Sequence, residues 1–312
     1  MIHRLYGQYV IENPRVQGRL LRGYNFVRRR VAEVHGVAGR VVAKKGVPTN
    51  VYYASVQKTG SHWFKAILED PRIRRVSGLR SYPGHRYEWG EFIRKFPPGH
   101  VVPALFVPYG LYEEIVKPED HRTFYVIRDP RDIVVSWYFS ARDTHRLVGK
   151  VPKYRAVLRA CSQDEGLHYA IETLSYTFAA MRTWAYAAPT DPAVLIVRFE
   201  DATARPVETF RAIFDHCRIP VPDDLLREVM ADYTKDAMRR MDDARPFWRQ
   251  RSLSDDSHYR PTASSWREAF TPAHHARFAE VNGDLLRLLG YEETDAVEPA
   301  GRPAAGTIAR TP

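Results

Sequence analysis

Short strand-like segments alternate with helix-like segments from residue 48 onward, and this alternation limits the fold more than any other feature of the sequence. Runs of β-branched and aromatic residues predict strands over 51–56, 101–107, 123–127 and 193–199. Helical patterns follow them after Ser61, after Pro130, and over 164–188 and 206–217. Strands that are separated by helices pair in parallel and are covered on both faces. The sequence therefore predicts an α/β fold with three layers, in which a central, mostly parallel sheet is flanked by helices.

The composition agrees with a soluble, folded chain. With 44% hydrophobic and 27% charged residues, it excludes a mainly disordered chain and a collagen-like fibre. The first residues lack the apolar core of a signal peptide, and no window has eighteen uninterrupted apolar residues, so we expect a cytoplasmic protein. Cys161 and Cys217 are the only cysteines, and we expect both to be thiols.

Composition divides the chain into three regions. Residues 1–47 form a basic N-terminal extension, residues 48–292 form the α/β domain, and residues 293–312 form a tail that we expect to be disordered. Within the domain, the polar stretch 242–265 is expected to be a long loop. In the extension, a helical stripe of apolar residues lies among arginines; its members are Leu20, Tyr24, Val27, Val31 and Val34. Such a helix rests on an anionic membrane or packs on its own domain, and we predict packing because it is commoner.

Arginine dominates the basic residues. The formal net charge is +10, and only nine of the 47 basic residues are lysine. Arg binds phosphate, sulfate and carboxylate groups in bidentate geometry, which favours an anionic ligand, although codon bias in a GC-rich genome gives the same composition. The basic residues are scattered and no recognition module is present, so we do not expect nucleic acid as a partner.

The first predicted strand runs into a polar turn over residues 55–63, Ser-Val-Gln-Lys-Thr-Gly-Ser-His-Trp. A turn between a strand and a helix points free backbone N–H groups and the positive helix end at one place, which suits a phosphate. Gly60 permits a close turn, Thr59 and Ser61 add hydroxyls, and Lys58 adds a charge. The ATPase signature G-x-x-x-x-G-K-[ST] is absent. The alternative is an ordinary turn in which Ser61 is the helix N-cap.

A second strand-to-helix turn follows at residues 125–138. Arg128 stands at the strand end, and Ser136 lies two helical turns later, so both can hold one phosphate. In the alternative interpretation, Arg131 and Asp132 cap the helix and Arg128 pairs with a carboxylate.

Together these segments resemble the PAPS-dependent sulfotransferases, whose sulfuryl donor is 3′-phosphoadenosine 5′-phosphosulfate (PAPS). The family's 5′-phosphosulfate loop, P-K-[ST]-G-[ST]-[TS]-W, is similar to residues 57–63, Gln-Lys-Thr-Gly-Ser-His-Trp. Its 3′-phosphate motif, an Arg at a strand end with a Ser eight residues later, is similar to Arg128 and Ser136. The resemblance covers roughly residues 50–291 and implies the P-loop-like nucleotide-binding architecture of the cytosolic and bacterial members.

Later segments resemble the family more weakly. Residues 199–201, Phe-Glu-Asp, look like the Y-E-D segment near the adenine, with Phe199 in place of Tyr. Tyr233 begins a segment similar to the one that lines the adenine side. Arg260 and Trp266 are what remains of R-K-G-x-x-G-D-W, which closes over the 3′-phosphate.

The resemblance implies roles for these residues. Lys58 would donate to the bridging oxygen as the sulfuryl group leaves, and the backbone N–H groups of Thr59 to His62, a run that includes Gly60 and Ser61, would hold the 5′-phosphate. Trp63 would flank the purine, and Arg128 with Ser136 would bind the 3′-phosphate. The resemblance implies PAPS as co-substrate and no metal ion.

The general base is the least defined part of this site. Many family members have a His on the strand before the 3′-phosphate motif, where Leu105 or Phe106 stands in this sequence. His62 in the donor turn and His100, five or six residues before that position, are equal candidates. Glu88 follows them, because other members of the family use Glu.

The sequence thus predicts transfer of a sulfuryl group from PAPS to a hydroxyl or amine of a small-molecule, lipid or glycan acceptor. Two alternatives stay open. One is a non-catalytic protein that binds a nucleotide or an anion on the same scaffold; the other is a P-loop kinase, which the missing Lys after Gly60 disfavours. We find no ligand cluster with zinc-like spacing and expect His274 to be exposed at the start of a helix. The acceptor and the oligomeric state are not defined by the sequence.

Overall fold

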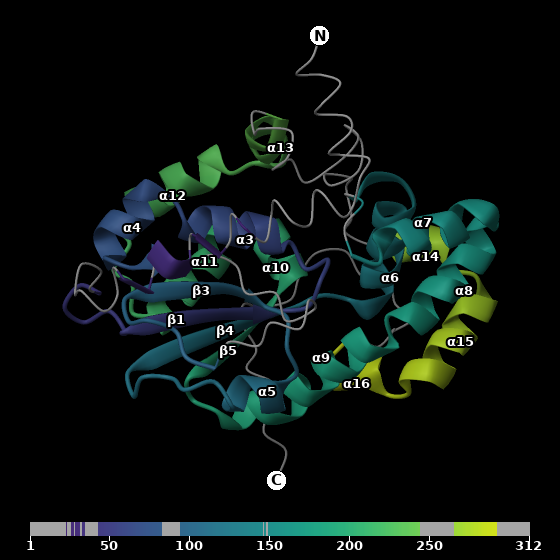
Figure 1. Cartoon of the computed structure of the whole chain (residues 1–312), viewed down its shortest axis with the longest axis horizontal. Coiled ribbons are helices and arrows are strands. Elements are labelled where there is room, and N and C mark those ends of the chain that lie inside the picture. Colours follow the sequence, from purple (N-terminus) through teal and green to yellow (C-terminus); the bar gives the residue numbers. More distant parts are fainter. Residues whose placement is uncertain are drawn as a thin grey trace.

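The computed structural model describes residues 43–82, 94–145, 147, 149–243 and 265–291, together with helical residues 23, 26, 27, 29–31, 33 and 34. The tail 293–312, most of the predicted loop 242–265, and the candidate site residues Glu88 and Arg260 lie outside these residues. Within them, the chain forms one sheet with helices on both faces (Figure 1).

Five parallel strands form the sheet, in the order β2-β3-β1-β4-β5. Their bounds are β1 (Asn50–Ser55), β2 (Arg80–Ser81), β3 (His100–Leu105), β4 (His121–Ile127) and β5 (Val194–Arg198). The four longer strands confirm the predicted ones. The strand β2 was not predicted, because two residues are too few to show an alternating pattern.

Successive residues of β1 point to opposite faces of the sheet and enter two separate cores. Val51 and Tyr53 pack with α3 (Ser61–Leu68), α4 (Pro71–Ser77), α11 (Pro206–His216) and α12 (Asp223–Asp232). Tyr52 and Ala54 pack with α5 (Tyr109–Glu113), α6 (Pro130–Phe139), α8 (Gln163–Thr173) and α9 (Ser175–Ala187). This alternation is the period-2 geometry of a strand that is buried on both sides. The predicted three-layer α/β fold is confirmed.

The remaining elements extend these layers. Helices α6 and α8 gather at one end of the sheet, on the right in Figure 1, with η2 (Ser140–Thr144), α7 (Val151–Ala160), α14 (Ser265–Ala269), α15 (Pro272–Asn282) and α16 (Leu285–Leu288). The other elements are η3 (Ala188–Thr190), α10 (Phe199–Ala204) and α13 (Lys235–Asp243), the last of which lies over the α3 side of the sheet.

The predicted long helix over 164–188 is wrong in one respect, because the structure divides it at Leu174. This residue has φ −90° and ψ 0°, ends α8 and precedes α9. The apolar pattern continues across the break, since buried residues of both helices contribute to the same core. Periodicity alone therefore gave no sign of the break.

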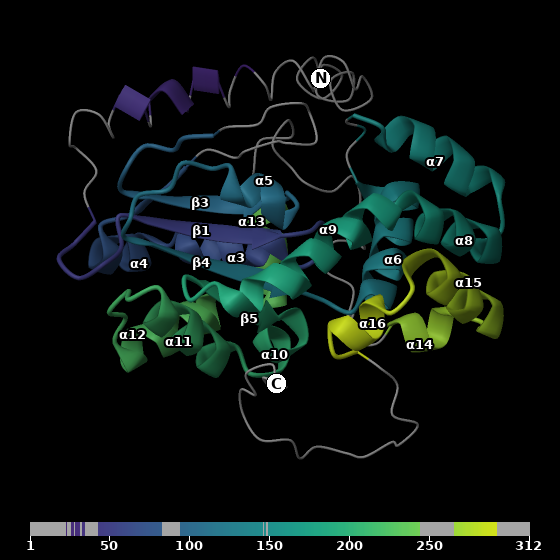
Figure 2. The same ribbon diagram turned by 90° about the horizontal axis from the view of Figure 1, so that it is seen from below.

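The prediction that the N-terminal stripe packs on the domain is wrong for the members that the structure describes. Val27, Val31 and Val34 are 60%, 48% and 63% exposed. Figure 2 shows this short helical segment, drawn in purple, outside the layers of the domain. A periodic pattern indicates an apolar helix face, but it does not identify the surface that covers this face. Among the described helices, none has both the length and the apolar character needed to cross a bilayer.

The topology places the two polar turns side by side. Strands β1 and β4 are parallel neighbours, with Ser55 opposite Val126 near their ends. The carboxyl ends of parallel strands lie at one edge of a sheet, where ligands of such folds bind. The turn after β1 and the turn after β4 therefore leave the sheet at the same edge.

Candidate active site

The turn after β1 has a backbone that requires glycine at position 60. Gly60 has φ +73°, in the left-handed region. A Cβ atom here would lie 2.5 Å from Cε2 of Phe199, the residue that follows β5. Lys58 has φ +68°, which is unfavourable for a residue with a side chain. The turn is therefore closely packed at Gly60 and strained at Lys58.

Helix α3 begins at this turn without a side-chain cap. Its N-cap is Gly60, so the alternative in which Ser61 is the N-cap does not hold. Thr59 donates its hydroxyl proton to the carbonyl of Val56 at 2.8 Å, which closes the turn rather than reaching outward. The first N–H groups of a helix without a side-chain cap are suited to binding an anion.

Arg128 joins the two turns. Its Nη1 donates to the backbone carbonyl of Lys58 at 2.8 Å, across 70 residues of sequence. Its guanidinium carbon lies 4.8 Å from the centre of the Phe199 ring, the same ring that faces Gly60. The turns after β1 and β4 therefore form one cluster with the residue that follows β5.

Two cations lie close together in this cluster. Burial and the charge of Arg128 lower the pKa of Lys58 from 10.5 to about 8. Burial also lowers the pKa of Arg128, against the opposing effect of Asp132 and Glu200. A bound anion would offset the repulsion between the two cations and favour their charged forms. The cluster therefore has the electrostatic character of an anion site.

The turn after β4 is held by Asp129. Its carboxylate caps α6 by accepting from the backbone N–H of Arg131 at 2.9 Å. Nε and Nη2 of Arg131 donate to the two oxygens of the same carboxylate at 3.1 Å and 2.8 Å. The cap is thus Asp129 rather than Arg131 or Asp132, and Arg128 stays directed at the first turn.

Glu200, for which no role was expected from the sequence, supports the same turn. Its Oε1 accepts from the backbone N–H of Asp129 at 2.9 Å, and its Oε2 accepts from the hydroxyl of Tyr291 at 2.6 Å. Burial raises the pKa of Glu200, against these hydrogen bonds and the nearby charge of Arg128. The signal available in the sequence was its place directly after Phe199 at a strand end.

Trp63 and Tyr233, both expected on the adenine side, are brought together. The indole Nε1 of Trp63 donates to the backbone carbonyl of Tyr233 at 2.8 Å, across 170 residues of sequence. The indole ring also packs edge-on against Phe210, with centroids 5.4 Å apart. The junction between α12 and α13 therefore lies beside the start of α3.

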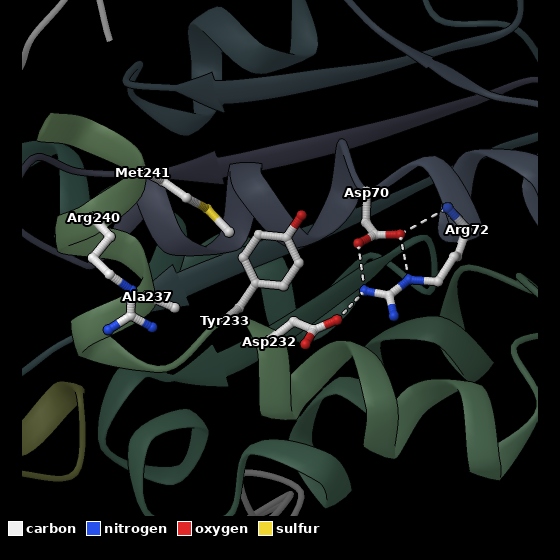
Figure 3. Close-up of a pocket in the computed structure, with 7 residues that line it drawn as sticks. All are labelled: Asp70, Arg72, Asp232, Tyr233, Ala237, Arg240 and Met241. Atoms are coloured by element: carbon white, nitrogen blue, oxygen red, sulfur yellow. Dashed lines mark hydrogen bonds and ion pairs between the residues drawn. The ribbon is translucent and has the colours of Figure 1, made fainter. Parts of the chain in front are cut away.

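A pocket of about 380 Å³ opens on the side-chain face of Tyr233 (Figure 3); it is lined by Asp70, Arg72, Asp232, Tyr233, Ala237, Arg240 and Met241. Nη2 of Arg72 bridges Oδ2 of Asp70 at 2.9 Å and Oδ2 of Asp232 at 2.7 Å. Burial and the charge of Asp70 raise the pKa of Tyr233 to about 12. Residues 58–63 do not line this pocket. Its ion pairs instead anchor the segment that contacts Trp63.

The two histidine candidates for the general base lie at opposite edges of the sheet. His62 is exposed in the first turn of α3, next to the donor turn. His100 begins β3 opposite the first residue of β1, is buried, and has its Nδ1 2.9 Å from the carbonyl of Pro98. The strands are parallel, so the start of β3 is far from the turn, and the structure does not support His100 as the base. The donor end of β3 carries buried Leu105.

Asp164, His168 and His274 have potential ligand atoms within 4.8 Å of one another. The expectation that His274 is exposed is wrong, because it is fully buried in a capping box of α15. Its Nδ1 accepts the backbone N–H of Thr271 at 2.9 Å, so a neutral ring carries its proton on Nε2. That Nε2 lies 3.0 Å from the carbonyl of Asp164, to which it donates. His274 is therefore a cap and a link between α8 and α15, and its geometry does not suit a metal ligand.

Most of the predicted site residues lie at one edge of the sheet. These are Lys58, Thr59, Gly60, Ser61, His62, Trp63, Arg128, Phe199 and Tyr233. Ser136 is half-buried on α6, and its hydroxyl forms no hydrogen bond within the described ranges. His100 lies at the other edge.

Comparison with known proteins identifies the family. The family model described as "Sulfotransferase domain" matches residues 48–290 of this chain. The chain belongs to the sulfotransferase family. Its assignment as a PAPS-dependent sulfotransferase, predicted from the two turns, is confirmed. No curated protein sequence matches the chain.

Solved structures show the same fold as this sulfotransferase. The crystal structure of mouse sulfotransferase SULT7A1 complexed with PAP has a TM-score of 0.56 at 19% identity, covering 83% of this chain and 94% of that chain. Retinol dehydratase in complex with androsterone and inactive cofactor PAP has a TM-score of 0.52 at 18% identity, covering 81% of this chain and 83% of that chain. The similarity confirms the P-loop-like sulfotransferase fold.

Proposed function

We propose that this sulfotransferase binds PAPS across the turns after β1 and β4, and transfers its sulfuryl group to a hydroxyl or amine of a small-molecule, lipid or glycan acceptor. The contact that carries the proposal is the 2.8 Å hydrogen bond from Arg128 to the carbonyl of Lys58. This contact supports a single site in which Arg128 binds the 3′-phosphate and Lys58 binds the 5′-phosphosulfate. The two structural neighbours were solved in complex with PAP, which supports an adenosine nucleotide as the ligand.

In the proposed reaction, the acceptor oxygen or nitrogen attacks sulfur, and the bond from sulfur to the bridging oxygen of the 5′-phosphate breaks. The electron pair of that bond stays on the phosphate, where the ammonium of Lys58 stabilises the charge. Uncapped N–H groups at the start of α3 hold the same phosphate. Arg128 and Ser136 bind the 3′-phosphate, and Trp63, Phe199 and Tyr233 bound the adenine.

His62 is the proposed base. Of the two histidine candidates, only His62 lies at the edge of the sheet that carries the turns after β1 and β4. Its imidazole would take the proton of the acceptor. Replacing His62 with Gln keeps its backbone N–H for the phosphate. This variant should lower the transfer rate about a hundredfold and remove the acidic limb of the pH profile, while PAP affinity stays near that of the unchanged protein. Unchanged transfer would exclude His62 as the base.

The acceptor is proposed as a class only. Retinol dehydratase was solved with androsterone, which supports an organic small molecule as the acceptor. A cytoplasmic location and the absence of a nucleic-acid partner stay predictions.

Calorimetric titration with PAP and transfer from labelled PAPS over an acceptor panel test the proposal. Lys58→Met should keep PAP binding but lower transfer at least about a hundredfold. Arg128→Ala should weaken PAP binding at least about tenfold, because a charge-assisted phosphate contact is lost. Lys153→Met, an exposed lysine on α7, is the control and should change neither.

A second function is favoured by one observation. The strand position where many family members have a catalytic His is occupied here by Leu105 or Phe106, which suits a non-catalytic nucleotide-binding protein. PAP binding without transfer to any acceptor in the panel would support that function. Failure to bind PAP would exclude transfer from PAPS and would leave only the binding of another nucleotide or anion.

A further inference from the structure

We propose that the basic N-terminal segment docks this sulfotransferase on an anionic lipid surface. The inference goes beyond the proposed function and does not rest on it. It rests on the charge of residues 1–47, on the exposed apolar side chains among the helical residues that the structure describes between 23 and 34, and on a basic patch where this segment enters the domain.

The net charge of the chain is concentrated in this segment. Residues 1–47 contain eight Arg and two Lys against two Glu, a net charge of +8. The other residues contain 37 basic and 35 acidic side chains, since the whole chain has 47 and 37, which leaves +2. An anionic surface therefore attracts the N-terminal segment far more strongly than the rest of the chain.

The described part of the helix also exposes apolar side chains. Phe26, Val27, Val31 and Val34 are 57%, 60%, 48% and 63% exposed, and they are four of the nine large hydrophobic side chains exposed in the described residues. The three valines share one helix face, because they are four and three positions apart. Nucleic acid attracts the charges but gives valine side chains no apolar environment. A lipid surface accommodates both, with the cations at the headgroups and the apolar face below them.

The acidic residue in the described part of this helix does not oppose such docking. Glu33 pairs with Nη1 of Arg30 at 2.8 Å. The guanidinium of Arg30 also lies 5.3 Å from the centre of the Phe26 ring. The long Arg side chain thus runs along apolar surface, which is the arrangement that keeps a charged end near lipid headgroups.

The basic character continues on the domain. Lys44 and Lys45 are exposed in the turn before β1, and the backbone N–H of Lys44 donates to the carbonyl of Ser77 at 2.9 Å, at the end of α4. The last turn of α4 carries exposed Arg74 and Arg75. Within the described ranges these four cations form no ion pair. The helix and this patch together offer a lipid surface more cations than the helix alone.

Co-sedimentation of the full chain with vesicles tests the proposal. The protein should sediment with vesicles of phosphatidylcholine and phosphatidylglycerol, should stay in solution with phosphatidylcholine alone, and should be released by salt. Two variants should each weaken partitioning at least about tenfold: Val27→Ser with Val31→Ser and Val34→Ser, and Arg29→Gln with Arg30→Gln, Lys44→Gln and Lys45→Gln.

Matched controls come from the domain. Val116→Ser replaces a valine that is 59% exposed, and Lys153→Gln removes an exposed charge on α7; both should partition like the unchanged protein. Circular dichroism shows that each variant is folded, and titration with PAP in parallel separates this test from that of the donor site.

Four results would overturn the proposal. They are no binding to vesicles that contain phosphatidylglycerol, equal binding to neutral vesicles, a triple-serine variant that partitions like the unchanged protein, and a dimer that the triple-serine variant converts to a monomer. The last result would assign the apolar face to a second copy of the chain.

Discussion

Lys58 combines a strained backbone with an unfavourable electrostatic environment. Its φ of +68° disfavours any residue with a side chain, and its half-buried side chain lies beside Arg128. A position that favoured stability alone would carry a neutral residue, or glycine. Strain and like charges are retained where they serve a ligand. At the residue scale, the backbone strain and the like charges support the proposed role of Lys58 in binding an anion.

Lys58 makes stability depend on pH. Its folded-state pKa, about 8, is below the ordinary value of 10.5, so the unfolded chain binds more protons between these values and this contribution to stability rises with pH. Below pH 8, the lowered pKa of Lys58 reduces the free energy of unfolding by its full amount. Lys58→Met should therefore raise the free energy of unfolding at pH 7 by up to about 3 kcal/mol. Urea denaturation of the unliganded protein should show this gain at pH 7 and its disappearance above pH 10.5; a gain independent of pH would contradict the electrostatic cause.

Gly60 should not tolerate a methyl group. Gly60→Ala places a Cβ atom 2.5 Å from Phe199 and requires a positive φ, so we expect a loss of about 2–4 kcal/mol in stability and at least tenfold weaker PAP binding. Thermal unfolding and PAP titration measure both effects. The double variant Gly60→Ala with Phe199→Leu should recover part of the stability, because the ring is removed but the backbone strain is not. Gly110→Ala is the control, since a Cβ atom there has no neighbour within 4 Å.

At the element scale, the start of α3 and the junction between α12 and α13 meet through Trp63 and Tyr233, which form the proposed adenine side. The bridge from Arg72 to Asp70 and Asp232 connects α4 with α12, next to Tyr233 (Figure 3). Because the bridge lies outside the donor turn, it supports the contact without touching a nucleotide in the proposed position.

Arg72→Leu should weaken the contact between Trp63 and Tyr233 without preventing folding. The carboxylate of Asp70 is nearly buried and would lose its cation, at a cost of about 1–3 kcal/mol. We expect PAP affinity to fall about three- to tenfold, with a larger change in the dissociation rate than in the association rate. Arg205→Leu removes an exposed i,i+4 ion pair and serves as the control. Equal PAP affinity in both variants would show that the bridge does not support the adenine side.

At the scale of the whole molecule, the C-terminal helices are connected to the sheet through the same turn that carries Arg128. Tyr291 donates its hydroxyl to Glu200, Nη2 of Arg131 donates to the carbonyl of Tyr291 at 3.0 Å, and the backbone N–H of Trp266 donates to Asp132 at 3.1 Å. The turn after β4 and the C-terminal helices are therefore expected to unfold together.

Tyr291→Phe tests this connection. Oε2 of buried Glu200 would lose its donor, so we expect a loss of about 1–3 kcal/mol and a further rise in the pKa of Glu200. The transition in urea should shift as one cooperative step when followed by both fluorescence and circular dichroism. Tyr186→Phe changes a tyrosine that is 60% exposed and should have little effect. Two separate transitions would indicate that the C-terminal helices unfold on their own.

Local patterns were sufficient for the strands and the two polar turns, because each depends on neighbours in sequence. They failed where the outcome depends on distant surfaces. The break at Leu174 lies inside a continuous apolar pattern. Val27 and Val31 have the spacing of a packed helix face but are exposed, and His274 lies at the start of a helix, where an exposed side chain is expected, but is buried. Periodicity records which residues are apolar, but not what lies against them.

The amino-acid sequence by itself determined the α/β fold, its parallel sheet and the residues of both polar turns, because turn chemistry and hydrophobic alternation are local properties. The resemblance of these turns to the PAPS-dependent sulfotransferases identified the family. Only the tertiary structure decided that Arg128 reaches Lys58, that Trp63 meets Tyr233, and that His62 rather than His100 shares their edge. These outcomes depend on strand order and direction, which place residues 70 to 170 positions apart in contact.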